Sequence, residues 1–246
     1  MEESEFRYMI EVDDRHWWYR GRRRVIHAQL ARLGLPPSLD ILDAGCGSGR
    51  TMDELCRYGT VSGFDLEPAG VEAARSRGHS DVGVARLEQT GRPDEAFDLI
   101  TCLDVVEHTP DDVASLHELR RVARRGGHLL LTVPAFQALW SEHDIANHHF
   151  RRYRWATLKR AALAAGWEPV SSTYFNTLLL APAAVVRLAA RMRGLPEAGD
   201  AKLDTRLTPG ALDGVLERPL ALEAAAIARG VRLPAGLSLM AVLRKP

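Results

Sequence analysis

The stretch that decides the fold is LDILDAGCGSG, residues 39–49. Its first six residues are mostly apolar, as expected of a buried strand, and the glycines that follow permit a sharp turn that opens a helix. Glycine is needed where a Cβ would keep a ligand away from the backbone, and the first N–H groups of a helix present positive potential to that ligand. We therefore expect this turn to bind a ligand.

A second signal lies twenty residues after Gly45, where Asp65 ends the next expected strand. A carboxylate at this position can accept hydrogen bonds from the hydroxyl groups of a ribose. A glycine turn alone is weak support for a nucleoside site, but the turn together with this acid at this distance is strong.

The spacing of the glycines separates two classes of ligand. The dinucleotide fingerprint requires G-x-G-x-x-G, whereas this chain has Gly45, Gly47 and Gly49, followed by Arg50 where the third glycine is required. Nicotinamide binding is therefore disfavoured. Asp43, just before the turn, suits a ligand with an ammonium group, which a pyrophosphate lacks.

From residue 38 onward, short apolar segments alternate with segments of helical period, which is typical of strand and helix units around a parallel sheet. The expected strands cover residues 39–44, 61–65, 82–85, 97–103, 128–133, 167–174 and 238–243. The expected helices cover residues 17–33, 49–58, 68–77, 110–125, 155–165, 178–188 and 211–228. Thr109 is expected to cap the fourth helix, and Gly126 and Gly127 to end it.

Composition limits the class of protein. The chain has 246 residues, of which 46% are hydrophobic and 26% charged, as in an ordinary globular protein. Thirty-two basic residues balance thirty-two acidic ones, so no global field favours nucleic acid or a membrane surface. Three cysteines do not form the even framework of a secreted domain, and we expect a cytoplasmic protein.

Two further segments bear on location. Residues 1–14 are acidic and polar, unlike a secretory signal. The longest apolar stretch, 178–186, is about half of the roughly 20 residues needed to cross a bilayer, so no transmembrane segment is expected.

At this point the chain resembles class I S-adenosylmethionine-dependent methyltransferases. The matching blocks are DAGCGSG (43–49), GFD (63–65), FDLI (97–100), DVVEH (104–108) and LRRV (119–122) with the glycines 126–127, and they cover roughly residues 39–134. The resemblance implies S-adenosyl-L-methionine as cofactor and S-adenosyl-L-homocysteine as product. It also implies an α/β, Rossmann-like, doubly wound seven-stranded sheet of order 3-2-1-4-5-7-6 with the last strand antiparallel.

The resemblance also assigns the cofactor contacts. Asp43 and the glycines would hold the methionine part, Asp65 the ribose, and Leu66 one face of the adenine. Residues 86–88 would lie near the adenine edge, where the family often has an aspartate and this chain has none. The expected cofactor-binding residues are Trp17, Tyr19, Arg20, Asp43, Gly45, Cys46, Gly47, Gly49, Asp65, Leu66, Leu87, Glu88, Leu103 and Asp104.

The stretches DRHWWYRGRRR (14–24), LWSEHD (139–144) and HHFRRY (148–153) look like a bacterial subgroup of these enzymes, whose small-molecule substrates are often unassigned. In such relatives the first element closes over the cofactor. We therefore expect residues 1–36 to form a helical lid and residues 37–246 the methyltransferase domain, with 137–154 and 175–232 as insertions that cover the substrate.

Methyl transfer from a sulfonium is an in-line displacement, so catalysis comes mainly from holding donor and acceptor together in a site cleared of water. A hydroxyl acceptor also needs a base, and histidine has a suitable pKa. The expected catalytic residues are His108, His143, Asp144 and His148, and the expected substrate contacts are His149, Arg151, Arg152 and Tyr153. No metal site is expected, since histidines in a loop are more often polar lid residues.

We therefore predict an enzyme that methylates oxygen, nitrogen or an activated carbon of a small molecule, anionic or hydrophobic, as in natural-product pathways. One alternative is a lipid or prenyl-phosphate acceptor, because arginines stand beside the apolar segment 178–188. Another is a non-catalytic scaffold that binds the cofactor. We expect no nucleic-acid partner, and the segment 178–188 leaves a homodimer contact open.

Overall fold

The computed structural model of the chain describes residues 10, 12–181, 184–185 and 210–246, without the side chains of residues 143 and 210–212. Residues 182–183 and 186–188 of the expected helix 178–188 lie outside these residues. The chain divides into two compact units. The first contains Met1–Leu35, Pro134–Tyr153 and Thr173–Leu239, and the second contains Pro36–Val133, Arg154–Ser172 and Met240–Pro246.

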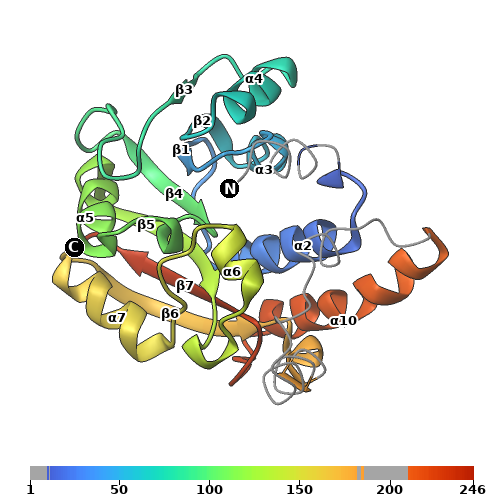
Figure 1. The fold of residues 1–246 in the computed structure, drawn as a ribbon. Coiled ribbons are helices and arrows are strands. Elements are labelled where there is room, and N and C mark those ends of the chain that lie inside the picture. The colour runs from blue at the N-terminus through green and yellow to red at the C-terminus, as the bar shows by residue number, and fades with distance from the viewer. Residues whose placement is uncertain (1–9, 11, 182–183, 186–209) are drawn as a thin grey trace. The chain divides into compact units, whose positions relative to one another are not determined.

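Seven strands form one sheet in the order β3-β2-β1-β4-β5-β7-β6, which confirms the predicted topology (Figure 1). The strands are β1 (Leu39–Ala44), β2 (Gly59–Asp65), β3 (Val82–Val84), β4 (Phe97–Leu103), β5 (Ala123–Pro134), β6 (Glu168–Phe175) and β7 (Ser238–Arg244). The pairs β1–β2, β1–β4, β2–β3 and β4–β5 are parallel. Lys245 exchanges backbone hydrogen bonds with Gly126 and Gly127, as in an antiparallel β5–β7 pair.

The central strands are buried on both faces, as a parallel sheet between helices requires. Ile41 lies between Val61 of β2 and Leu99 of β4, and both Ile41 and Leu99 are fully buried. The described helices include α2 (Trp17–Arg32), α3 (Arg50–Leu55), α4 (Pro68–Ser76), α5 (Asp112–Val122), α6 (Glu142–Ala146), α7 (Trp155–Ala164) and α10 (Gly210–Ala228), with the 3-10 turns η1 (Val106–His108) and η2 (Gln137–Leu139). Parallel strands end at one edge, so the segments after β1, β2 and β4 leave the sheet together.

The predicted start of α5 is wrong by two residues. Its cap is Asp111, not Thr109, because the Asp111 carboxylate accepts the Ala114 N–H at 2.9 Å. The Thr109 hydroxyl instead donates to the Val106 carbonyl at 2.8 Å and closes η1. Asp111, whose side chain satisfies a first-turn N–H, therefore sets the start of the helix.

The predicted end of α5 is also wrong. The helix ends at Val122, and β5 begins at Ala123, so Gly127 belongs to a strand. A Cβ on Gly127 would lie 2.8 Å from the Arg124 carbonyl oxygen. Position 127 therefore requires glycine because the backbone of Arg124 comes too close for a side chain. Arg124 donates to Asp98 at 2.6 Å and to Asp40 at 2.8 Å, and these ion pairs favour the extended path.

In the first unit, α2 packs against α10. A Cβ on Gly21 would lie 2.4 Å from Leu220 Cδ1, so the glycine allows close helix packing. Val25 and Ile26 are buried on the predicted apolar side of α2. Among the helices that the structure describes, none combines the length and the apolar character that crossing a bilayer requires.

Candidate functional site

The loop after β1 forms an open backbone cradle. Gly45, Gly47 and Gly49 have φ values of +80°, +52° and +78°, which L side chains rarely adopt. A Cβ on Gly45 would lie 2.3 Å from Val105 Cγ2, so this position has no room for a side chain. A Cβ on Gly47 would meet nothing within 4 Å, so its backbone faces open space. A ligand can therefore approach the Gly47 backbone directly.

Asp65 joins this loop to the end of β2. One carboxylate oxygen accepts the Gly47 N–H at 2.8 Å and the other accepts the Glu67 N–H at 2.9 Å. Burial raises the pKa of Asp65, while these two N–H donors oppose the rise. Each oxygen retains further acceptor capacity for a hydroxyl of a ligand.

Asp43 is held by a residue that the sequence reasoning missed. The Thr101 hydroxyl of β4 donates to the Asp43 carboxylate at 2.6 Å, and both side chains are buried. The available signal was a hydroxyl residue in the otherwise apolar middle of strand FDLITCL, residues 97–103. Thr101 therefore fixes the orientation of the acid that precedes the glycine loop.

The loop carries negative potential. Burial raises the pKa of the Cys46 thiol well above its usual range, and the charges of Asp43 and Asp65 raise it further. Cys46 is therefore an unreactive packing residue at neutral pH. The same two carboxylates would favour a ligand with positive charge.

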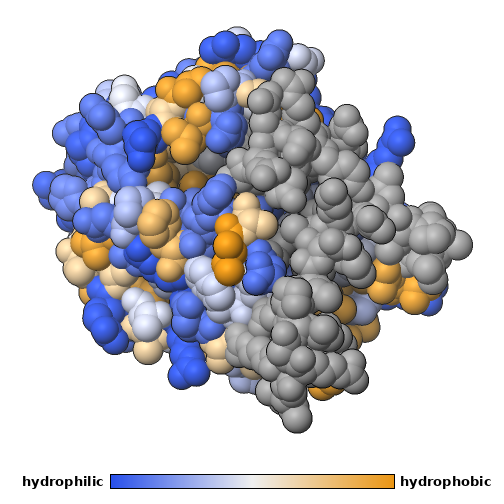
Figure 2. All heavy atoms as spheres, viewed as in Figure 1, coloured by the Kyte–Doolittle hydropathy of each residue, from blue (hydrophilic) through white to orange (hydrophobic). Residues whose placement is uncertain are grey.

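Apolar surface lies beside Asp65. Leu66 and Val84 are 56% and 57% exposed, and Figure 2 shows apolar side chains gathered over β3. Leu87, which was also expected to contact the cofactor, is buried, and Glu88 is half-buried with its carboxylate 3.9 Å from Arg86 Nε. Leu66 is thus available to a flat apolar ligand, whereas the buried Leu87 side chain packs inside the protein.

Two more expected cofactor residues and one expected catalytic residue follow β4. Leu103 is buried, and Asp104 is half-buried with a positive φ of +57°. His108 ends η1, is half-buried, and donates its backbone N–H to the Val105 carbonyl at 3.0 Å. All three lie in the unit that contains the glycine loop.

The expected lid residues lie on α2 in the first unit. The Trp17 ring centroid is 5.5 Å from that of His16, and Tyr19 is buried. Arg20 forms an ion pair of 2.8 Å with Glu217 of α10. The guanidinium of Arg20 therefore already has a carboxylate partner within its own unit.

A buried polar cluster occupies residues 141–152 of the first unit. The fully buried Asp144 carboxylate accepts the Ser141 N–H at 2.8 Å, His149 Nδ1 at 2.8 Å and Arg152 Nε at 2.7 Å. Burial alone would raise the pKa of Asp144, but the hydrogen bonds of His149 and Arg152 hold it well below its usual range. The expected catalytic acid is thus joined to two residues that were expected to bind substrate.

The other expected residues of this segment are not brought into that cluster by any described contact. The His143 side chain lies outside the described residues, and His148 is exposed with a φ of +55°. The Arg151 guanidinium lies 5.9 Å from the Phe150 ring centroid, and Tyr153 is buried. The roles of all these residues stay predictions.

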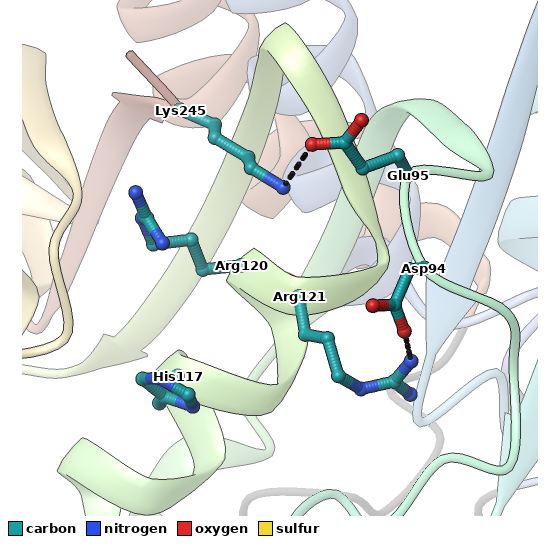
Figure 3. A pocket seen from close by; sticks show the side chains of 6 residues that line it. All are labelled: Asp94, Glu95, His117, Arg120, Arg121 and Lys245. Atoms are coloured by element: carbon teal, nitrogen blue, oxygen red, sulfur yellow. Dashed lines mark hydrogen bonds and ion pairs between the residues drawn. The ribbon is translucent and has the colours of Figure 1, made fainter.

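A charged cavity of about 430 Å³ lies at the opposite edge of the sheet, where β4 and β5 begin and β7 ends (Figure 3). Lys245 forms an ion pair of 3.2 Å with Glu95, and Arg121 pairs with Asp94. The full lining is Asp94, Glu95, His117, Arg120, Arg121 and Lys245. Both carboxylates of the lining are thus paired within the cavity, and we assign the cavity no part in the candidate site.

Comparison with known sequences identifies the domain. Residues 42–131 match the family described as "Methyltransferase domain". A "Ubiquinone biosynthesis O-methyltransferase" of Xanthomonas oryzae is 32% identical over 149 residues, which cover 53% of this chain and 60% of that protein. The chain spans about 40 to 60% of the length of the curated relatives it matches.

Comparison with solved structures identifies the fold. A phosphoethanolamine N-methyltransferase of Haemonchus contortus, solved with phosphomonomethylethanolamine and S-adenosylhomocysteine, has a TM-score of 0.59 at 18% identity and matches 89% of this chain and 52% of its own. The [4+2]-cyclase SpnF has a TM-score of 0.57 at 19% identity, over 90% of this chain and 81% of its own. The resemblance to class I methyltransferases is therefore confirmed in domain and in fold.

Proposed function

We propose that this chain, with its methyltransferase domain on a class I sheet, transfers the methyl group of S-adenosylmethionine to an oxygen atom of a small molecule. The observation that supports this proposal most directly is the 2.8 Å hydrogen bond from the Gly47 N–H to the Asp65 carboxylate. It joins the loop that suits the methionine part to the acid that suits the ribose. The name of the Xanthomonas relative, an O-methyltransferase, supports oxygen over nitrogen or carbon as the acceptor.

The residues at this edge of the sheet fit the cofactor. Gly47 offers its backbone to open space, and Asp43 and Asp65 supply negative charge beside it. Leu66 offers an exposed apolar surface to an adenine ring. When bound, S-adenosylmethionine would supply a methyl group on a positively charged sulfur, and the protein itself need not supply a nucleophile.

A hydroxyl acceptor must lose its proton, and two histidines are candidates for the base. We assign this role first to His108, because it follows β4 in the same unit as the glycine loop. The second candidate is His149, whose Nδ1 lies 2.8 Å from Asp144. If Nδ1 donates to that carboxylate, Nε2 is the nitrogen that takes up a proton in the neutral ring.

A second candidate function is cofactor binding without methyl transfer. The likeness to a [4+2]-cyclase favours it, because one fold supports several chemistries. The two functions share the glycine loop and Asp65 and differ only in the fate of the methyl group.

The test uses the full chain and S-adenosylmethionine with an isotopically labelled methyl group. The protein is first titrated with S-adenosylhomocysteine, then incubated with a panel of phenols, alcohols and amines matched in size. We expect saturable binding and label on a hydroxyl oxygen. Absence of binding contradicts the proposal, label on amines alone contradicts the acceptor, and binding without transfer to the panel or to a host extract favours the second candidate.

A further inference from the structure

The turn between β3 and β4 is fixed at both ends. At its start, the Ala85 N–H donates to the Asp65 carbonyl oxygen at 3.0 Å. Within the turn, the Gln89 N–H donates to the Arg86 carbonyl oxygen at 3.1 Å. The turn thus begins directly beside Asp65, the acid to which we assign the ribose, and it carries Leu87 between its ends.

At the other end, Glu118 of α5 holds Thr90. One oxygen of the Glu118 carboxylate accepts both the Thr90 N–H at 2.9 Å and the Thr90 hydroxyl at 2.7 Å. Thr90 is buried, and the Glu118 side chain is only 13% exposed. A double hydrogen bond to a largely buried carboxylate limits where Thr90 can lie.

Arg121, one helical turn further along α5, fixes Glu118 in turn. Its Nε and one terminal nitrogen each lie 2.7 Å from a different Glu118 oxygen, which is a two-point ion pair. The same terminal nitrogen donates to the Arg92 carbonyl oxygen at 2.7 Å. The other terminal nitrogen pairs with Asp94, and Figure 3 shows this ion pair. Hydrogen bonds from Arg121 lower the pKa of Glu118 to about 2, so the carboxylate is ionised at neutral pH.

Arg92 extends this network back to β2. Its guanidinium donates to the Gly63 carbonyl oxygen at 3.0 Å and to the Asp81 carboxylate at 2.7 Å. Gly63 lies two residues before Asp65 on the same strand. The turn is therefore connected to the β2 end through Ala85 on one side and through Arg92 on the other.

This arrangement differs from an ordinary surface ion pair. Exposed pairs between mobile side chains contribute little to a fold and fix no neighbouring segment. Here four polar groups of the segment 90–94 bind to Glu118 or Arg121, and these are the Thr90 N–H, the Thr90 hydroxyl, the Arg92 carbonyl and the Asp94 carboxylate. The pair thus determines the path of the chain that follows Leu87.

We propose that Glu118 is a positioning residue for base recognition, which holds the turn 86–89 in place beside Asp65 so that this turn recognises the adenine edge of the cofactor. The inference rests on the proposed function. Glu118 acts through Thr90 and does not itself contact the cofactor.

The test compares two ligands that differ only in the base, S-adenosylhomocysteine and S-inosylhomocysteine, by calorimetric titration of the full chain. We expect the unaltered protein to prefer the adenine ligand. In Glu118→Ala the dissociation constant for S-adenosylhomocysteine should rise about tenfold, the worth of one hydrogen bond, and that for S-inosylhomocysteine should change less. Thr90→Val removes the hydroxyl bond and keeps the N–H bond to Glu118, so it should give a smaller loss of preference with a smaller structural change.

The matched control is Glu168→Ala, which removes a carboxylate from an exposed ion pair of 3.6 Å with Arg244. It should leave the preference for adenine unchanged. If Thr90→Val lowers only the melting temperature and keeps the preference, the positioning role is contradicted while the cofactor assignment stands. If the unaltered protein binds neither ligand, the proposed function fails and this inference with it.

Discussion

At the scale of the residue, the sequence predicted the acids of the candidate site but not the groups that hold them. Asp43 and Asp65 could be chosen because each lies at the end of a strand pattern at a fixed distance from the glycines. Thr101 is 58 residues from Asp43 and meets it only because β1 and β4 are adjacent, with Asp43 opposite Thr101 in the register. Such a pair depends on strand order, which a local pattern does not contain.

The first prediction concerns this pair. Thr101→Val should weaken binding of S-adenosylhomocysteine by about 1–2 kcal/mol, because the buried Asp43 carboxylate loses its hydroxyl donor. Thr101→Ser retains the donor and should restore most of the affinity. Calorimetric titration of both variants checks this, and equal weakening in both would show that packing, not the hydroxyl, is what matters.

At the scale of the element, the strands were predicted better than the ends of the helices. The ranges 39–44 and 97–103 coincide with β1 and β4, because their apolar runs have no competing pattern. The ends of α5 were missed because Thr109, Asp111 and the glycines 126–127 are all common at helix ends, and only tertiary contacts decide among them.

The second prediction concerns the glycine loop. Gly45→Ala should destabilise the protein by about 2–3 kcal/mol and abolish cofactor binding, because its Cβ would lie 2.3 Å from Val105 at a φ of +80°. Gly78→Ala, at a φ of +101° with nothing within 4 Å, should cost only about 1 kcal/mol and leave binding intact. Chemical denaturation with parallel ligand titration distinguishes the two, and similar losses in both would contradict the steric argument.

The third prediction concerns the cluster around Asp144. Because the pKa of Asp144 is held well below its usual range in the folded state, its ionised form stabilises the fold above about pH 4, the ordinary aspartate value. This contribution is lost as the pH falls toward the lowered value. Asp144→Asn should cost about 3 kcal/mol at pH 7, since it leaves Arg152 buried without its charge partner.

The measurement is urea unfolding between pH 3 and pH 7. The unaltered protein should lose stability on acidification by more than Asp144→Asn does, so the two curves should converge at low pH. His148→Ala, which changes an exposed side chain of the same segment, should follow the unaltered protein. Parallel curves for the unaltered protein and Asp144→Asn would contradict the ionised, paired state of Asp144.

At the scale of the whole molecule, the sequence predicted the order of all seven strands through its resemblance to a family, and not through periodicity. The substrate side was less predictable. The residues 137–153 are weakly periodic, and among the described side chains it is His149, which was expected to contact substrate, that pairs with Asp144. Spacing along a loop does not determine which side chain turns inward.

The fourth prediction separates the two candidate bases. Once an acceptor hydroxyl is identified, His108→Ala should lower kcat by about 100-fold or more while the affinity for S-adenosylhomocysteine changes little, as expected for a lost general base. His149→Ala should lower kcat less if His108 is the base. Single-turnover transfer rates check this. Full activity in His108→Ala together with a large loss in His149→Ala would move the role to His149.

The most direct test of the central claim is calorimetric titration of S-adenosylhomocysteine into the unaltered chain and into Asp65→Ala. The control is Glu72→Ala, which removes an exposed carboxylate of α4. We predict binding that Asp65→Ala weakens by about 1–3 kcal/mol, the cost of a lost polar contact, and that Glu72→Ala leaves unchanged. Equal affinity in the unaltered chain and in Asp65→Ala would contradict the assignment of Asp65 and the glycine loop to the cofactor.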